Sequence, residues 1–320
     1  MDKQSFHLLA VDGGGTKTLA VITDSKGSIL GEGKEGASNY QVTGKEMAIK
    51  ALTASIQEAL ANVNVPNGGM IHFEKIVFAL AGIDTLTDEI EVRGIVEKTI
   101  KQVGLSTEKL LVENDCLSAL LGATQNKAGA LLISGTGSIV FAHDGQGNFY
   151  RTGGWGYRVG DEGSGYWIGK EAIRSILKMN DGREKETILS KLILQEFGFK
   201  KVEDLYNWVY SSAYCVDDVS ALTTLVEEAY KMGDGVSKGI LDEAAEELTL
   251  LLETTIKKAG IAKEEFQLIL QGGVIQNNHY IRDIVLDRLK EKAEKVKIID
   301  TDQKPITFII QRGLNLKWGL

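Results

Sequence analysis

The chain has 320 residues, of which 43% are hydrophobic and 25% charged; this composition is ordinary for a globular protein, and the length is enough for two domains. A formal net charge of −8, without a basic stripe, argues against a nucleic-acid partner, and no apolar run approaches the length of a membrane span. The two cysteines, Cys116 and Cys215, form neither a metal motif nor a disulfide framework, which favours a reducing compartment.

The first segment, residues 8–21, predicts a strand, a tight turn and a second strand. An apolar run ends in an acid, three glycines follow, and two hydroxyl residues flank a lysine: Asp12, Gly13, Gly14, Gly15, Thr16, Lys17 and Thr18. Three glycines release the turn from the usual limits on φ and let a ligand approach the backbone, where successive N–H groups form a nest for anions. Asp12 could hold Mg²⁺ through water. The alternative is a glycine-rich hairpin without a ligand.

The elements that follow predict a mixed sheet with right-handed crossovers. Residues 31–36 match the pattern GxGxxG in letters, but no helix opens at their end, so we interpret them as a turn. The hydrophobic pattern then predicts a helix over 45–63, a strand over 75–82, a helix over 88–103, a strand over 110–115 and a short helix.

Residues 129–147 repeat the plan of the first segment. An apolar run ends in Ser134, the turn Gly135, Thr136, Gly137 and Ser138 follows, and a second apolar run leads to the turn 144–147, which matches the turn at 24–27. A whole supersecondary unit therefore occurs twice. Two such hairpins could clamp one polyphosphate between two domains.

The remaining chain begins with a glycine-rich loop over 153–165, which contains Trp155. Ser164 is expected to cap a helix, residues 186–260 are mostly helical, and a buried strand over 266–273 ends in Gly272 and Gly273. A helix over 279–292 and a strand over 296–300 follow, and the apolar tail from Pro305 is assigned no element. We interpret Trp155 and Trp167 as packing residues.

Several polar positions have both a chemical and a structural interpretation. Asp115 follows the strand over 110–115 and precedes a helix; a carboxylate at a helix start stays ionised and suits a hydroxyl-proton acceptor, but it could equally be a helix cap. Gly272 and Gly273 could let the backbone lie against a nucleobase, or form a helix-entry turn. Asp161 and Glu162 could contact a ligand, or be solvated loop acids.

With these motifs, the chain resembles the BadF/BadG/BcrA/BcrD-type ATPases and, within them, the N-acetylglucosamine kinases. The segments that carry the resemblance are 12–18, 38–39, 114–115, 132–138, 153–156, 160–164 and 271–274. The resemblance implies an α/β, two-domain actin-like ATPase (ribonuclease H-like) fold with duplicated mixed sheets, flanking helices and a central cleft. The implied domains are residues 1–122 and 123–320, and the last helix is free to pack back on the N-terminal domain. The bulky residues 307–313 depart from the small-residue closing helix of the family.

The resemblance also assigns roles to residues. It places the catalytic base at Asp115 and the acid near the metal at Asp12. ATP-binding positions fall on Gly13, Gly14, Gly15, Thr16, Lys17, Thr18, Gly135, Thr136, Gly137, Ser138, Gly272 and Gly273. Substrate-binding positions fall on Asn39, Gly82, Asn114, Asp115, Gly154 and Asp161.

The function implied is ATP-dependent phosphorylation of the C6 hydroxyl of N-acetylglucosamine or a close amino sugar, with ATP and Mg²⁺, in the cytoplasm. The partner is an amino-sugar substrate, with no nucleic acid and no membrane, and a homodimer is compatible with the resemblance. One alternative is an N-acetylmuramic acid or glucosamine kinase on the same fold. Another is a catalytically silent nucleotide- or sugar-sensing protein, against which the retention of Asp12, Asp115 and both turns argues.

Overall fold

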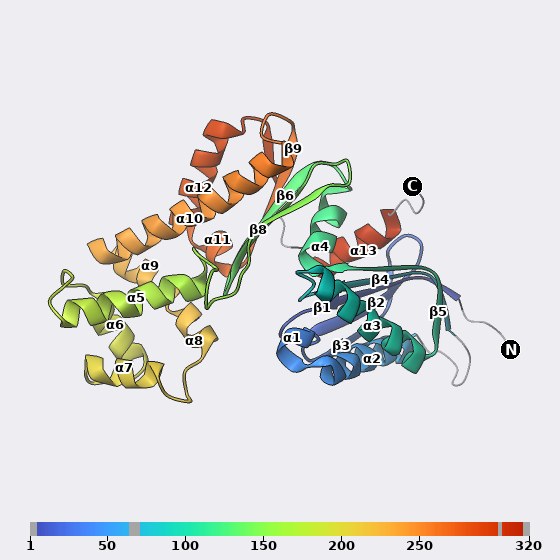
Figure 1. The fold of residues 1–320 in the computed structure, drawn as a ribbon, viewed down its shortest axis with the longest axis horizontal. Coiled ribbons are helices and arrows are strands. Elements are labelled where there is room, and N and C mark those ends of the chain that lie inside the picture. Colours follow the sequence, from blue (N-terminus) through green and yellow to red (C-terminus); the bar gives the residue numbers. More distant parts are fainter. Residues whose placement is uncertain (1–4, 64–70, 300–302, 316–320) are drawn as a thin grey trace. The chain divides into compact units, whose positions relative to one another are not determined.

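The structure, a computed structural model, describes residues 5–63, 71–299 and 303–315, and the chain folds into two compact units. The first unit contains the described residues up to Lys127 together with the C-terminal helix, and the second begins at Ala128. The chain therefore leaves the first unit a few residues beyond position 122. Figure 1 shows that strands and helices are combined in both units.

The first unit is built on a five-stranded sheet in the order β3-β2-β1-β4-β5. Its strands are β1 (Ser5–Gly13), β2 (Thr18–Thr23), β3 (Ile29–Glu35), β4 (Ile71–Leu80) and β5 (Leu105–Asn114), and its helices are α1 (Tyr40–Thr43), α2 (Lys45–Ala61), α3 (Leu86–Val103), α4 (Asp115–Thr124) and α13 (Pro305–Asn315). The first three strands form an antiparallel meander, whereas β4 and β5 run parallel to β1. In register, Gly13 pairs with Leu80 and Leu80 with Asn114, so the carboxyl ends of three strands lie at one edge.

Both faces of this sheet are covered. Leu9 and Val11 of β1 belong to a core shared with α2 and α3, while Leu8 and Ala10 belong to a second core shared with α13. Successive side chains of a strand point to opposite faces, so a continuous apolar run such as β1 is the expected pattern for a strand buried on both sides.

The apolar tail, to which the sequence pattern assigned no element, forms helix α13. It packs on α4 and on β1, and Ile309 is fully buried there. A Cβ atom on Gly122 of α4 would lie 1.9 Å from the carbonyl oxygen of Phe308, so only glycine lets the two helix backbones come this close. The bulky tail therefore still closes the fold, because α4 supplies the small residue at the contact.

The expectation of a turn at residues 31–36 was wrong, because this segment forms most of β3. Gly31 and Gly33 are buried against α2, where added Cβ atoms would lie 2.4 Å from the carbonyl oxygen of Ala59 and 2.0 Å from that of Ser55. These glycines let a helix lie directly on an edge strand, and they do not form a nucleotide turn.

The second unit repeats the topology with the strand order β10-β9-β6-β7-β8. Its strands are β6 (Gly129–Ser134), β7 (Ser138–His143), β8 (Phe149–Gly153), β9 (Phe266–Gln271) and β10 (Val296–Ile299). Strand β6 pairs antiparallel with β7 and parallel with β9, as β1 does with β2 and β4. The predicted internal repeat and the duplicated mixed sheets are confirmed. The final residue of the predicted strand 296–300 lies outside the described residues.

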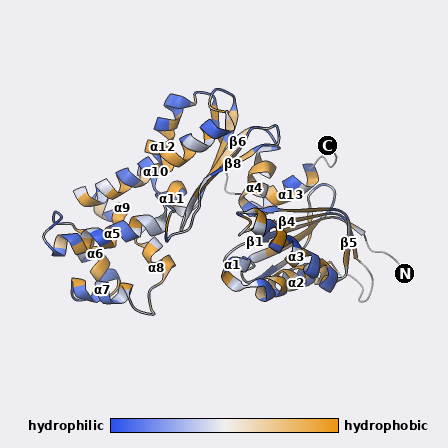
Figure 2. Ribbon diagram, in the orientation of Figure 1, coloured by the Kyte–Doolittle hydropathy of each residue, from blue (hydrophilic) through white to orange (hydrophobic). Residues whose placement is uncertain are grey.

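Helices form most of the second unit's mass: α5 (Gly165–Asn180), α6 (Leu189–Glu196), α7 (Val202–Val209), α8 (Val216–Ala221), α9 (Thr223–Lys231), α10 (Gly235–Ala259), α11 (Gly273–Asn277) and α12 (His279–Lys292). Figure 2 shows hydrophobic and hydrophilic stretches alternating along α5, α10 and α12, as expected for helices with one buried side. Ser164 caps α5 by accepting a hydrogen bond from the backbone N–H of Trp167, as predicted. Within residues 5–63, 71–299 and 303–315, no helix has both the length and the apolar character to cross a bilayer.

Candidate active site

Two carboxylates meet at the carboxyl edge of the first sheet. Asp12 lies near the end of β1, and Asp115 is the first residue of α4, directly after β5. The pKa of Asp12 is raised to about 6, first by burial and then by the charge of Asp115, while the ammonium of Lys17 opposes both effects. Two like charges that affect each other in this way share one site.

Asp115 is not the cap of its helix. Asn114 occupies the cap position, and its Oδ1 accepts hydrogen bonds from the backbone N–H groups of Cys116 at 3.0 Å and Leu117 at 3.2 Å. The capping interpretation of Asp115 was therefore wrong, although its carboxylate does accept hydrogen bonds from Cys116. Burial is the main cause that raises the pKa of Asp115, which makes this carboxylate a better proton acceptor than an exposed one.

Asn39 and Gly82 lie side by side in the loops after β3 and β4. Gly82 has a left-handed φ of +85°, and a Cβ atom there would lie 2.7 Å from Oδ1 of Asn39. The amide of Gln41 donates a hydrogen bond to the carbonyl oxygen of Gly82 at 3.4 Å. Any side chain at position 82 would therefore displace Asn39.

The first glycine turn holds this neighbouring segment in place. The backbone N–H groups of Ser38 and Asn39 both donate to the carbonyl oxygen of Gly14, at 3.0 and 3.1 Å. The first unit thus brings together most of the residues that the sequence assigned to it: Asp12, Asn39, Gly82, Asn114 and Asp115 at one edge of the sheet, beside the turn 13–18.

The glycines of the first turn are not needed for unusual backbone angles, because none of Gly13, Gly14 and Gly15 has a positive φ. Gly13 is required by packing, since its Cβ atom would lie 2.4 Å from Oγ of Ser38. A Cβ atom on Gly15 would meet no heavy atom within 4 Å, and Thr16 and Lys17 next to it are exposed. The protein's own packing does not explain a glycine there, whereas a ligand that approaches the backbone would.

The hydroxyl of Thr18 has an internal partner. It is buried and donates to the carbonyl oxygen of Gly36 at 2.7 Å, which fastens the end of β3 to the turn. Thr16 is therefore the residue of this turn whose hydroxyl faces solvent.

The second turn occupies the same place between two strands as the first, but it is one residue shorter, spanning 135–137 where the first spans 14–17. The backbone N–H of Gly135 donates to the carbonyl oxygen of Gly137 at 2.9 Å, and Thr136 at the tip is exposed. The hydroxyl of Ser138 donates to the carbonyl oxygen of Glu162 at 2.7 Å, so it serves the structure as Thr18 does. The tip residue Thr136 corresponds to Thr16 of the first unit.

Gly272 lies against this second turn. It has a φ of +98° and precedes α11, and a Cβ atom on it would lie 2.4 Å from the carbonyl oxygen of Ser134. Gly272 and Gly273 thus form a helix-entry turn, and the same glycines bring the start of α11 next to the phosphate-type turn.

In the second unit, a pocket of about 300 Å³ opens between the turn at Gly135, the turn at Gly273 and helices α8 and α9. It is lined by Gly135, Thr136, Ser220, Thr223, Thr224, Glu227, Gly273, Val274, Asn277 and Asn278. The sequence singled out Gly135, Thr136 and Gly273 of this lining. It did not single out the polar side chains on α8 and α9 or at Asn277 and Asn278, because such side chains on helical stretches carry no local signal. Glu227 accepts a hydrogen bond from the amide of Asn278 at 3.3 Å, which gives the pocket wall a fixed polar group.

Asp161 fastens the glycine-rich loop to the second turn. Its Oδ1 accepts a hydrogen bond from the backbone N–H of Gly156 at 3.1 Å, and a Cβ atom on Gly137 would lie 2.8 Å from its Oδ2. It is buried and has a left-handed φ of 58°, so the interpretation of Asp161 as a solvated acid was wrong. Burial is the first cause that raises its pKa, and the backbone hydrogen bonds from Gly156 and Ser138 oppose it.

The two tryptophans near this loop differ. Trp167 packs against the core of the second unit, as expected. Trp155 is 69% exposed, and the guanidinium of Arg151 lies over its ring at 4.9 Å. The prediction of a packing role was therefore wrong for Trp155. The guanidinium of Arg151 also donates to the carbonyl oxygen of Gly154, the loop residue assigned to the substrate.

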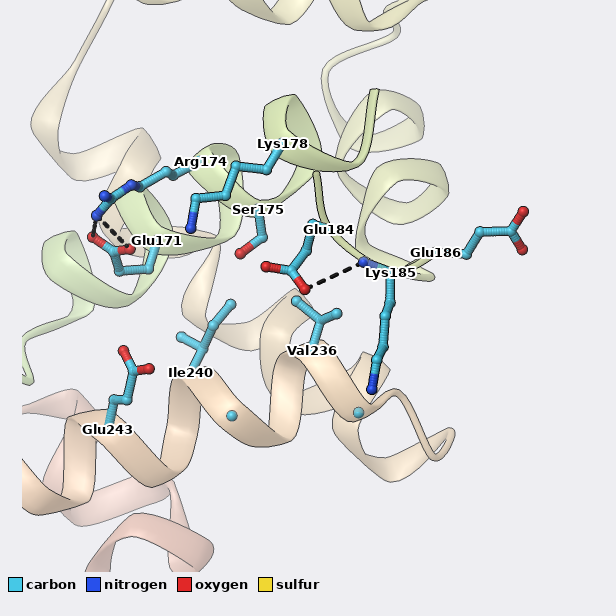
Figure 3. Close-up of a pocket in the computed structure, with 12 residues that line it drawn as sticks. Glu171, Arg174, Ser175, Lys178, Glu184, Lys185, Glu186, Val236, Ile240 and Glu243 are labelled. Atoms are coloured by element: carbon cyan, nitrogen blue, oxygen red, sulfur yellow. Dashed lines mark hydrogen bonds and ion pairs between the residues drawn. The ribbon is translucent and has the colours of Figure 1, made fainter. Parts of the chain in front are cut away.

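A second pocket, of about 480 Å³, lies between α5 and α10 (Figure 3). Its wall is strongly charged, and on α5 Arg174 donates to the carboxylate of Glu171, three residues earlier, at 3.3 Å. None of the residues that the sequence assigned to chemistry lines this pocket. We therefore place the candidate active site at the glycine turns and not here.

Comparison with known proteins agrees with this geometry. Residues 9–307 match the BadF/BadG/BcrA/BcrD ATPase family. The chain belongs to this family. Among family members and relatives, it is 36% identical over 293 residues to the N-acetylmuramic acid/N-acetylglucosamine kinase of Clostridium acetobutylicum, covering 92% of this chain and 93% of that protein. It is 31% identical to the N-acetyl-D-glucosamine kinase of Dictyostelium discoideum, covering 99% and 100% of the two chains.

Solved structures show the same fold for this family member. A Chromobacterium violaceum protein described as an N-acetylglucosamine kinase superposes with a TM-score of 0.71 at 23% identity, covering 96% of this chain and 98% of that chain. The ROK hexokinase of Thermus thermophilus superposes with a TM-score of 0.55 at 15% identity, covering 96% and 97%. The predicted actin-like sugar-kinase fold is confirmed.

Proposed function

We propose that this protein is an ATP-dependent kinase that phosphorylates the C6 hydroxyl of N-acetylglucosamine or a close amino sugar. The observation that carries the proposal is the edge of the first sheet. There Asp115, whose carboxylate is not the cap of α4, lies at the same edge as Asp12, Asn39 and Gly82. The names of the relatives from Clostridium acetobutylicum and Dictyostelium discoideum support the amino-sugar substrate.

The first unit would bind the sugar and supply the base. Asp115 would accept the proton of the attacking hydroxyl, a role that asks for a positioned carboxylate with a pKa above the usual range. Asn39 would contribute an amide to the sugar hydroxyls, and its position depends on the absence of a side chain at Gly82. Phosphoryl transfer requires mainly such positioning and charge neutralisation.

The second unit would bind the nucleotide. The pocket of about 300 Å³ between the second turn and helices α8 and α9 has room for a nucleoside, and Thr136 at its rim would contact a phosphate. In the first unit, Thr16 and the open backbone at Gly15 would contact a phosphate of the nucleotide. Exposed turn N–H groups of this kind bind phosphates without a Walker lysine.

A magnesium ion fits the donor set at the edge of the first sheet. Mg²⁺ is held by one or two carboxylates together with phosphate oxygens, and Asp12 is a partly exposed carboxylate destabilised by the charge of Asp115. Among the residues that the structure describes, no group of three or more His, Cys, Asp or Glu side chains could hold a metal ion. The ion would neutralise charge on the transferred phosphoryl group. Cytoplasmic location and a homodimeric assembly belong to the same proposal and are supported by the family resemblance alone.

A second candidate substrate is N-acetylmuramic acid, because the Clostridium acetobutylicum relative is named for both sugars. A third is glucosamine, the substrate in the name of a Vibrio cholerae relative with 26% identity over 67% of this chain. These sugars differ at C2 and C3, so the same chemistry at C6 would serve each of them.

The test is ADP release measured in a coupled assay over N-acetylglucosamine, N-acetylmuramic acid and glucosamine. NMR of the product locates the phosphate. The variant D115N is expected to lose about 10²–10⁴-fold in kcat while binding of sugar and ATP remains. The matched control D144N removes an exposed turn acid of the second unit and should leave kcat unchanged. A wild-type protein that releases no ADP in response to any amino sugar would refute the proposal.

A further inference from the structure

Arg312 of α13 joins two segments that flank the helix of the proposed catalytic base. Its Nε and Nη2 donate to the two carboxylate oxygens of Glu113 at 3.0 and 3.2 Å, and its Nη1 donates to Oδ1 of Asn126 at 2.9 Å. Glu113 lies two residues before Asp115, and Asn126 lies two residues after the end of α4. One guanidinium therefore contacts the segment before α4 and the segment after it.

The contact with Glu113 is sheltered from solvent. The side chains of Arg312 and Glu113 are 12% and 10% exposed. A two-pronged arginine–carboxylate pair fixes the direction of both groups, which a lysine cannot do because its ammonium is a single point of charge. The end of β5, from which Asn114 and Asp115 follow, is thus held in one orientation.

The contact with Asn126 falls on a left-handed stretch of backbone. Gln125 and Asn126 have positive φ values of 52° and 62°, a conformation that asparagine tolerates and glutamine adopts rarely. Both precede Lys127, the last residue of the first unit before the chain continues into the second. Arg312 therefore ties the exit of the chain from the first unit to the strand that carries the proposed base.

The helix that presents Arg312 is itself firmly placed. Gly122 of α4 is in backbone contact with α13 at Phe308, and a Cβ atom on Gly313 would lie 2.7 Å from Leu8. Neither helix can rotate without breaking these contacts, so the guanidinium has a fixed origin.

We propose that Arg312 is a positioning residue for the phosphoryl-transfer reaction: it holds Glu113, and through it the Asn114–Asp115 segment, in register with the connection at Gln125–Asn126. This inference rests on the proposed function, in which Asp115 is the base. Small displacements of a catalytic group can cost about 10²-fold in rate. Loss of the arginine is therefore expected to reduce kcat and to leave the affinity for ATP unchanged, since no part of the nucleotide pocket of about 300 Å³ contains these residues.

The experiment compares R312K, N126G and the double variant with the wild type. Lysine keeps the positive charge next to Glu113, so the fold is retained, and glycine at 126 keeps the left-handed backbone while it removes the acceptor. R312K should lower kcat by about tenfold or more and change the KM for ATP less than about twofold. N126G should lower kcat by less, and the double variant should match R312K, because two changes that break one contact are not additive.

The control is K75Q. The ammonium of Lys75 donates to the carbonyl oxygen of Leu314 at 3.2 Å, so this variant loosens α13 at a place away from Glu113 and should leave kcat unchanged. Equal losses of kcat in K75Q and R312K would overturn the proposal, because general loosening of α13 would then explain both. A kcat of R312K within about twofold of the wild type, or effects of R312K and N126G that simply multiply, would also overturn it.

Failure of the proposed function would look different. If the wild-type protein phosphorylates no amino sugar, the function is refuted whatever Arg312 does. A separate readout then remains: hydrogen exchange of the α4 amides should be faster in R312K than in K75Q, and equal exchange in the two variants would refute the positioning role on its own.

Discussion

Asp161 offers a graded test of how the glycine-rich loop contributes to sugar binding. Its carboxylate accepts backbone hydrogen bonds from Gly156 and Ser138, and its own backbone is left-handed. Asparagine tolerates this backbone but can accept only one of the two bonds. Glycine tolerates the backbone and accepts neither, while alanine loses both bonds and is also strained.

The expected costs follow from these losses. Each hydrogen bond contributes about 1 kcal/mol, and the left-handed backbone costs alanine about 1 kcal/mol. The loop should therefore be destabilised by about 1 kcal/mol in D161N, about 2 kcal/mol in D161G and about 3 kcal/mol in D161A. If sugar binding requires the ordered loop, the KM for the sugar should rise by up to about 5-fold, 30-fold and 160-fold in that order.

The assay is steady-state kinetics at saturating ATP, together with hydrogen exchange of residues 153–165. The KM for ATP should change little in all three variants. Equal increases of the sugar KM in D161N and D161A would contradict this reasoning, because they would mean that the charge of Asp161 acts on the sugar directly. A sugar KM within about twofold of the wild type in all three, a difference of about 0.4 kcal/mol, would remove the loop from the sugar site.

Two further predictions test the turns and the sugar edge. T136V should lower kcat/KM for ATP by about tenfold or more, because it removes a hydroxyl that would donate to a charged phosphate. S25A, in an exposed turn, should have no effect on kcat/KM. Equal effects of the two variants would mean that the wrong turns of the repeat were assigned to the ligand. D88N should lower the free energy of unfolding by about 2 kcal/mol at neutral pH, because the carboxylate accepts hydrogen bonds from Tyr40, Gln41 and Thr85. These bonds, that of Tyr40 first, hold the pKa of Asp88 well below its usual range. The stability advantage of the wild type over D88N is therefore full above about pH 4 and is lost as the pH falls further. Urea unfolding at several pH values measures this advantage, and a difference in unfolding free energy that stays constant with pH would contradict the assignment.

The parts of the fold that were predictable from the sequence depend on local patterns. The two hairpins around the glycine turns, the helices α2 and α3 and the cap at Ser164 are all encoded within short windows of sequence. The position of Asp115 at the junction of a buried strand and a helix was equally visible, because an apolar run before a polar pair predicts where a parallel strand ends. Its neighbour Asn114 took the capping role, and a choice between two adjacent polar residues depends on backbone geometry that the letters do not contain.

The parts that were missed depend on contacts between distant segments. β3 was interpreted as a turn because its glycines are explained only by α2, which packs on it with the carbonyl oxygens of Ser55 and Ala59. Helix α13 was missed because its partner, Gly122, lies far away in the sequence. The polar pocket lining on α8 and α9 was missed for the same reason. No periodic pattern in the local sequence marks which face of a helix will border a cavity.

The glycines of the two phosphate-type turns show why a motif alone does not reveal its physical reason. Gly13 and Gly272 exclude side chains because the protein's own atoms, Oγ of Ser38 and the carbonyl oxygen of Ser134, occupy the space. At Gly15 no heavy atom of the protein lies within 4 Å of an added Cβ atom, and φ is not positive. Packing and backbone angle therefore account for the first two glycines but not for Gly15. A turn that receives a ligand would have such a glycine, which neither packing nor φ requires, next to an exposed threonine. The contrast between Gly15 and the other two glycines therefore supports the assignment of this turn to a phosphate more strongly than the run of glycines in the sequence does.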